Sequence, residues 1–133
     1  MKVNKTMARI VFLLYLAVLM YLCFGKFSGI PQAPRNLFGI EGDKAVHFIM
    51  FLPFPILSYF AFPFPPHRVW HSVLLVLCIL TVGSAFAAGT ELIQDFIPYR
   101  KADTEDFMAD FLALCISSAA VLLTDLNKTA RNA

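Results

Sequence analysis

Long hydrophobic runs separated by short polar segments make up most of this chain. Four runs approach or exceed the roughly 20 residues that an α-helix needs to cross a hydrocarbon core about 30 Å thick. They lie near residues 8–25, 45–64, 70–93 and 105–124. The pattern predicts an all-α membrane protein in which four transmembrane helices form a bundle.

Composition supports a membrane protein and limits its complexity. The chain has 133 residues, of which 59% are hydrophobic and 15% are charged, and this exceeds the apolar content typical of a soluble domain. The length predicts a single transmembrane domain over residues 1–133. A net charge of +2 gives no indication of a nucleic-acid partner, so the expected partners are membrane lipids.

The flanking charges predict the orientation. The first run follows Lys2, Lys5 and Arg9 without a small-residue cleavage pattern, and we interpret it as a retained signal anchor. Basic residues tend to stay on the cytoplasmic side, so both termini of a four-span chain are expected in the cytoplasm. The excess of basic residues on the cytoplasmic side becomes larger when Lys44 and Arg100 are counted as partners of nearby carboxylates rather than as topology signals.

Several residues inside the runs predict local packing. Pro53 and Pro55 each lack a backbone N–H, so the second helix should bend and leave carbonyls that need other partners. Small residues recur at intervals of four, which predicts close helix contact, at the pairs Gly83/Ala87, Ser84/Ala88 and Ala85/Gly89. Cys23, Cys78 and Cys115 lie inside the runs and are expected to be packing residues.

Polar residues gather where the hydrophobic runs begin or end. The second run opens with Asp43, Lys44 and His47, the third closes with Glu91 and Gln94, and Arg100 precedes a fourth-run stripe of Asp103, Asp106 and Asp110. Ionisable groups are costly at bilayer depth and are retained mainly where they pair, bind or react. The first loop, 26–43, is rich in glycine and proline and is expected to cover the site. The sequence therefore predicts one polar site at one membrane face.

The acidic stripe contains one residue that helix capping does not explain. Asp103 or Thr104 can cap the fourth helix, and acids are favoured in its first turn. Asp110 lies about two turns deeper, roughly 10 Å along the axis. We therefore expect a partner for Asp110 inside the bundle.

The spacing of these residues resembles the VanZ-like family of small bacterial membrane proteins, named after a teicoplanin-resistance factor. The family motifs Asp-Lys-x-x-His, Glu-x-x-Gln and Arg-x-x-Asp-x-x-Asp correspond to Asp43–His47, Glu91–Gln94 and Arg100–Asp106. Asp110 stands where the family usually has asparagine. The resemblance covers about residues 40–120 and implies a role in the bacterial cell envelope, with a link to teicoplanin resistance. It implies no established reaction.

The polar residues at the ends of the hydrophobic runs suggest a catalytic site. The enzyme would act on an envelope lipid or a lipid-linked glycan precursor, with Glu91 or Asp106 as general acid or base and His47 as the proton-transfer partner. Lys44 and Arg100 would hold a phosphate. The other polar residues would bind substrate, namely Asp43, Gln94, Asp103 and Asp110.

Three alternatives remain open from the sequence. The catalytic hypothesis requires no cofactor, but a variant of it adds a divalent cation held by Asp106, Asp110 and Glu91, because hard cations bind carboxylate oxygens. A non-catalytic alternative treats the cluster as a structural network, or as a binding site for lipid or antibiotic. The third is a proton relay, which the absence of matching polar residues at the other face disfavours.

Overall fold

The structure is a computed structural model that describes residues 4–26, 39, 42–62 and 68–131. Its helices are α1 (Lys5–Phe24), α2 (Gly42–Phe51), α3 (Pro53–Ala61), α4 (Val69–Gln94) and α5 (Thr104–Arg131). No strand occurs among the described residues. Most of the predicted covering loop lies outside them.

Four helical segments are long and apolar enough to cross a membrane, and α2 and α3 together form one of them. The protein is thus an all-α, multi-pass membrane protein, as the hydrophobic pattern predicts. The spans run Lys5–Phe24, Gly42–Ala61, Val69–Gln94 and Thr104–Arg131. The largest error in the predicted bounds is at the last span, which continues seven residues beyond 124.

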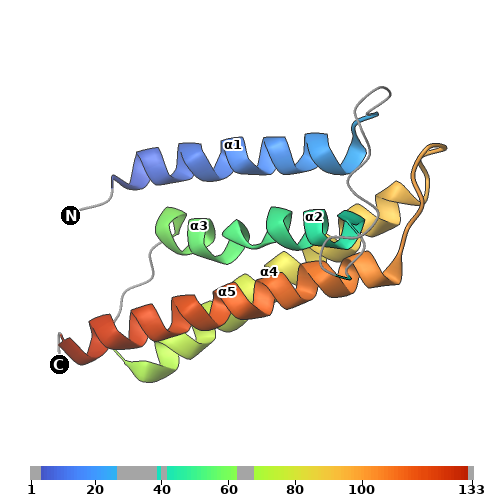
Figure 1. The fold of residues 1–133 in the computed structure, drawn as a ribbon. Helices are drawn as coiled ribbons and strands as arrows, with labels where there is room; N and C mark the ends of the chain where they lie inside the picture. Colours follow the sequence, from blue (N-terminus) through green and yellow to red (C-terminus); the bar gives the residue numbers. More distant parts are fainter. Residues whose placement is uncertain (1–3, 27–38, 40–41, 63–67, 132–133) are drawn as a thin grey trace.

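The four spans form an antiparallel bundle in which α5 contacts α2, α3 and α4. Figure 1 shows α2 and α3 between α1 and α5, with α4 beside α5. Helix α1 lies at the outside and packs on α3 and α4. It buries Phe12, Leu19 and Cys23, while its outer face exposes apolar side chains such as Leu13 and Leu14. In a membrane this outer face contacts lipid.

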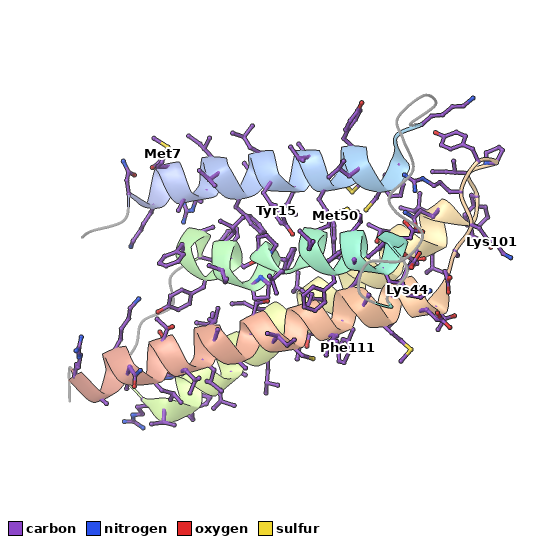
Figure 2. All side chains as sticks on the ribbon, in the orientation of Figure 1. Met7, Tyr15, Lys44, Met50, Lys101 and Phe111 are labelled. Carbon is purple, nitrogen blue, oxygen red and sulfur yellow. The ribbon has the colours of Figure 1, made fainter. Side chains whose placement is uncertain are left out.

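The second span breaks at Leu52, between the end of α2 and Pro53. The two prolines explain the break, because neither can donate the backbone hydrogen bond that would continue the helix. Near the end of α2, the Met50 carbonyl accepts a hydrogen bond of 2.6 Å from the Tyr15 hydroxyl of α1. Figure 2 shows Tyr15 pointing toward this part of the second span. The expected interruption of the second helix is observed. The Met50 carbonyl does not lie four residues before either proline, so it is not one of the carbonyls that the prolines leave without a donor.

This contact leads to a first prediction, that Tyr15→Phe lowers the free energy of unfolding by about 1 kcal/mol, the usual net value of one hydrogen bond. Thermal unfolding of the protein in detergent micelles would measure the loss. The control is Tyr99→Phe, because the Tyr99 hydroxyl also donates to a carbonyl, that of Phe24, but at an exposed position where water can replace it. Equal losses in the two variants would contradict the prediction.

Close packing by small residues occurs at Gly83 and is absent at Gly89. A Cβ atom added at Gly83 would lie 2.8 Å from Leu114 Cδ2 and 3.1 Å from Phe54 Cε1, whereas one added at Gly89 meets no described atom within 4 Å. Ala87, one turn after Gly83, is fully buried. The predicted pair Gly83/Ala87 is therefore at a helix interface. Gly89, in the pair Ala85/Gly89, makes no such close approach.

The three cysteines differ in their surroundings. All are free, and Cys23 is buried as expected for a packing residue. Cys78 is exposed on α4 and Cys115 is half-buried on α5. The prediction that all three pack inside the bundle was wrong for Cys78, because a free thiol is apolar enough to face lipid as well as protein.

Candidate functional site

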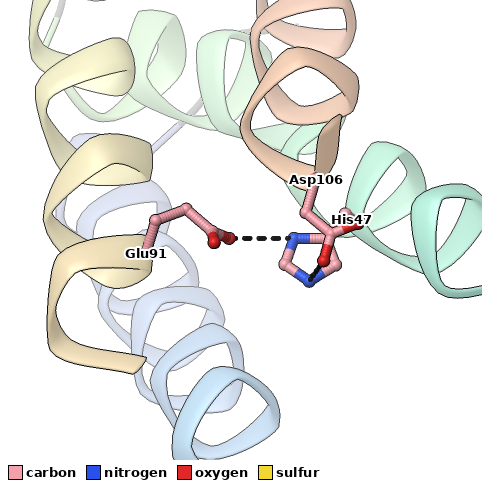
Figure 3. A group of neighbouring side chains, drawn as sticks. All are labelled: His47, Glu91 and Asp106. Atoms are coloured by element: carbon pink, nitrogen blue, oxygen red, sulfur yellow. Dashed lines mark ion pairs between the residues drawn. The ribbon is translucent and has the colours of Figure 1, made fainter. Parts of the chain in front are cut away.

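One end of the bundle brings together the C-terminal ends of α1 and α4 with the N-terminal ends of α2 and α5. Four buried polar residues meet there: His47 from α2, Glu91 from α4, and Asp106 and Asp110 from α5. We call these four residues the acidic cluster. Figure 3 shows the imidazole of His47 between the carboxylates of Glu91 and Asp106. Three of the four spans thus contribute to one site.

His47 contacts all three carboxylates of the acidic cluster. Its Nδ1 lies 3.2 and 3.3 Å from the two oxygens of Asp110 and 3.8 Å from Glu91 Oε1. Its Nε2 lies 3.7 Å from Asp106 Oδ2. Asp110 is fully buried, at 0% exposure, and is the partner expected inside the bundle. Because both Asp110 oxygens face one ring nitrogen, this carboxylate orients the imidazole.

The two oxygens of Glu91 have different surroundings. Oε2 accepts a hydrogen bond of 3.1 Å from the backbone N–H of Asp103. Oε1 is buried and has no hydrogen-bond partner among the described residues. A buried carboxylate oxygen without a hydrogen bond is unfavourable and needs an explanation. Glu91 therefore presents one available oxygen inside the cluster.

A polar cavity of about 520 Å³ adjoins the acidic cluster. His47 and Asp106 are part of its wall. The other charged residues of the wall come from the start of α2 and the segment between α4 and α5: Asp43, Arg100, Lys101 and Asp103. This volume is within the range of small-molecule sites.

A second, mainly apolar hollow of about 350 Å³ adjoins the segment between α4 and α5. Its wall includes Glu91 of the acidic cluster and the apolar side chains of Ala88, Leu92 and Phe107. Residues 102–104 belong to the walls of both hollows. A polar space and an apolar space thus meet beside the acidic cluster.

The remaining predicted site residues have more varied positions. Asp103 caps α5, because its Oδ1 accepts from the backbone N–H of Glu105 at 2.9 Å. Asp43 is exposed at the start of α2 and lines the polar cavity. Lys44 does not line the cavity; it forms an ion pair of 2.7 Å with the exposed Glu105.

Gln94 and Arg100 connect the site to α1. Gln94 Nε2 donates to the carbonyl of Cys23 at 2.9 Å. Arg100 Nη2 donates to the carbonyl of Leu22 at 2.9 Å and is 3.3 Å from that of Gly25. These donors satisfy carbonyls that the end of a helix leaves without intrahelical partners. Gln94 and Arg100 thus bind the end of α1 and also line the polar cavity.

A second buried polar group lies at the opposite end of the bundle. The expectation that this face has no polar residues to match the acidic cluster, which was the argument against a proton relay, was therefore wrong. Tyr59 donates to Asp125 Oδ1 at 2.7 Å, and Lys128 donates to the Tyr59 hydroxyl at 3.0 Å. Asp125 is buried on α5 beyond residue 124, where the fourth span was expected to end. The signal was present, because Asp110 and Asp125 are fifteen residues apart, which places them on nearly the same helix face.

No family model matches this chain. The uncharacterized protein C11E3.10 of Schizosaccharomyces pombe is 28% identical over 116 residues, which are 87% of this chain and 61% of that protein. The chain thus spans less than two thirds of the length of this curated relative. No solved structure matches. The chain is similar to a eukaryotic protein whose name carries no activity.

Proposed function

We propose that this protein is an enzyme of the bacterial cell envelope that acts on a membrane lipid or a lipid-linked glycan precursor. The observation that carries the proposal is the position of the acidic cluster between a polar cavity and an apolar hollow. An amphipathic molecule has a polar head and an apolar chain, and the two spaces offer separate surroundings for these parts. A lipid fits this arrangement better than a wholly polar substrate.

Two cationic side chains of the polar cavity suit a head group that carries phosphate, although three carboxylates, those of Asp43, Asp103 and Asp106, share the same wall. Arg100 and Lys101 lie in its wall, and cationic side chains form strong, charge-assisted hydrogen bonds with phosphate oxygens. Lys101 takes the place that the sequence hypothesis assigned to Lys44, whose ion pair is with Glu105 outside the cavity. The head group would then lie beside His47 and Asp106.

The acidic cluster provides reacting groups for hydrolysis or group transfer. Asp110 orients His47 in the way that a carboxylate orients the histidine of a catalytic triad. Glu91 Oε1 lies 3.8 Å from His47 Nδ1 but has no hydrogen-bond partner among the described residues, so it would be able to take a proton from an attacking water or hydroxyl. We therefore assign the catalytic role to His47, Glu91 and Asp106.

The distribution of basic residues supports an extracytoplasmic site. Five described basic residues, Lys5, Arg9, Arg68, Lys128 and Arg131, are at the end of the bundle opposite the acidic cluster, against four at the end of the cluster, Lys26, Lys44, Arg100 and Lys101. Basic residues favour the cytoplasmic side, which would place the cluster at the outer face of the cell membrane. The VanZ-like motif order agrees with this location, and reduced teicoplanin susceptibility is the phenotype that the resemblance suggests.

A second candidate function is lipid binding without catalysis. The observation that favours it is the use of Gln94 and Arg100 to join the end of α1 to the site. In this case the acidic cluster fixes the helices, and a lipid or lipid-tailed antibiotic occupies the two spaces unchanged.

A turnover assay separates the two candidates. The full chain in nanodiscs is incubated with a bacterial extract of lipids and lipid-linked glycans, and products are detected by mass spectrometry. We expect Glu91→Gln and Asp106→Asn to reduce turnover by about 100-fold or more, the effect of losing a general acid or base. Glu105→Gln, at an exposed acid of the same end, should keep turnover.

The assay also identifies the outcomes that contradict catalysis. Helix content and thermal unfolding are measured on the same samples. Unchanged turnover in both variants would contradict the catalytic assignment. A wild-type protein that retains lipid without converting it would support the binding alternative. Loss of folding in both conservative variants would support a structural network.

A further inference from the structure

Three buried side chains of the acidic cluster present atoms of the kind that bind divalent cations. One ligand atom each of His47, Glu91 and Asp106 lies within 4.8 Å of the other two. The three residues come from three helices, so the bundle holds them in place independently of one another. We propose that His47, Glu91 and Asp106 bind one divalent cation of the first transition row, and that Asp110 is the positioning residue for His47.

The Oε1 atom of Glu91 is the observation that distinguishes the three residues from a cluster of acids held only by hydrogen bonds to their neighbours. Glu91 is buried, and its Oε1 has no hydrogen-bond partner among the described residues. Leaving a buried polar atom without a partner costs about 1–3 kcal/mol, and more for a charged group. A cation at the centre of the three residues would satisfy this oxygen.

Asp110 has the position of the carboxylate that commonly supports a metal-binding histidine. Such a histidine donates its second ring N–H to a carboxylate or carbonyl, which fixes the ring and makes it a better ligand. Here both Asp110 oxygens lie within 3.3 Å of His47 Nδ1, and Nε2 lies 3.7 Å from Asp106 Oδ2. Glu91 Oε1 is 3.8 Å from Nδ1, so the Glu91 side chain must shift toward Nε2 to join the ligand set. With the proton on Nδ1, the lone pair of Nε2 is free to bind an ion. The cation ligands expected from the sequence were Asp106, Asp110 and Glu91. In the proposed site, His47 is the third ligand and Asp110 supports it.

The ligand atoms select the class of ion. One imidazole nitrogen and two carboxylate oxygens suit Mn²⁺, Fe²⁺ or Zn²⁺, whereas Mg²⁺ and Ca²⁺ prefer sites made of oxygen alone. Three carboxylates share the buried space with one imidazole, so the group carries excess negative charge unless protons or a cation neutralise it. Ligand distances of about 2.1 Å require the side chains to draw together around the ion. His47 and Asp106 also line the polar cavity, which leaves room for further ligands.

The binding step is independent of the proposed enzyme activity, but its catalytic consequence rests on that proposal. A bound cation would polarise a phosphoryl or carbonyl oxygen of the head group. Glu91 and Asp106 would then serve as ligands, and this role would replace the acid and base roles assigned to them above.

The experiment is a titration of the full chain in nanodiscs, without added lipid substrate, after removal of metal by a chelator. Calorimetry with Zn²⁺ and with Mn²⁺ should show one saturable site. Glu91→Gln and Asp106→Asn should each weaken binding by about 100-fold or more, and Asp110→Asn by about 10- to 100-fold, as expected for a residue that supports a ligand. Glu105→Gln should bind as the wild type does, and Mg²⁺ should bind at least 100-fold more weakly than Zn²⁺.

A second measurement uses only the wild-type protein, so it does not depend on the folding of any variant. Electron nuclear double resonance of bound Mn²⁺ should detect one coupled nitrogen, from His47. The inference is overturned by absence of a saturable site, by a bound Mn²⁺ without a nitrogen ligand, or by wild-type affinity in both carboxylate variants. The turnover assay tests the two proposals separately. Turnover that persists in the presence of a chelator, in a protein that binds no cation, would contradict the cation site but not the proposed enzyme activity.

Discussion

Replacing His47 with leucine should lower the free energy of unfolding by about 3 to 5 kcal/mol, the loss expected when one partner of a buried ion pair is removed. The imidazole contacts three buried carboxylates, and leucine would leave Asp110 without the hydrogen bond from Nδ1. Unfolding in mixed micelles with increasing SDS, followed by circular dichroism, would measure the change.

A surface pair provides the matched control. Glu105→Gln removes one ion pair of Lys44, but the Glu105 side chain is 66% exposed, so the loss should be at most about 1 kcal/mol. The double variant His47→Leu/Asp110→Leu should recover part of the stability, because an apolar pair can replace a buried ion pair with little loss. The single variants His47→Leu and Asp110→Leu each lower the free energy of unfolding by some amount. A double variant whose loss equals the sum of these two amounts would contradict the ion-pair explanation.

This comparison also bears on why the chain retains these groups. If the apolar double variant is as stable as the wild type, the acidic cluster is not required to hold the helices together. Retention of three acids and a histidine at a buried position would then be explained by binding or catalysis rather than by stability. A double variant that fails to assemble would instead favour the structural network.

The fold followed from the sequence because a membrane imposes one strong constraint. Each span needs about 20 apolar residues, and the helices were placed within a few residues of their observed ends except at the end of α5. There the polar residues after 124 hid the continuation of the helix. Asp125 is tolerated in it because its carboxylate accepts a hydrogen bond from the Tyr59 hydroxyl, which in turn accepts one from Lys128. A single sequence does not reveal such partners.

The meeting of the acidic cluster could be predicted, but its internal pairing could not. Helical spacing placed Asp106 and Asp110 on one face and required a partner for the deeper acid. That this partner is His47 depends on how α2 and α5 pack together, which the spacing within one helix does not determine.

Long polar side chains were the least predictable. Gln94 shares a face with Glu91, yet its amide reaches the carbonyl of Cys23 at the end of α1. Lys44 follows Asp43 in the sequence, yet it pairs with Glu105 on another helix. A long side chain can reach several helix ends, so its partner follows from tertiary packing rather than from its own helix face.

Replacing Gly83 with leucine should have the other large effect on stability, a loss of about 3 kcal/mol, at the upper end of the usual range for overpacking. An added Cβ alone would lie 2.8 Å from Leu114 Cδ2, and both Leu114 and Phe54 are buried with little space to move. The same unfolding measurement in micelles would detect the loss.

Gly89→Leu on the same helix is the control, because a Cβ at Gly89 meets no described atom within 4 Å. There the higher helix propensity of leucine should make the variant as stable as the wild type or more stable, by up to about 1 kcal/mol. A loss at Gly89 as large as that at Gly83 would mean that the helix needs both glycines for another reason, such as association between copies of the protein. A loss confined to Gly83 would confirm that α4 lies close against α3 and α5 at this point, the contact that holds Glu91 two turns farther along α4 in place opposite His47.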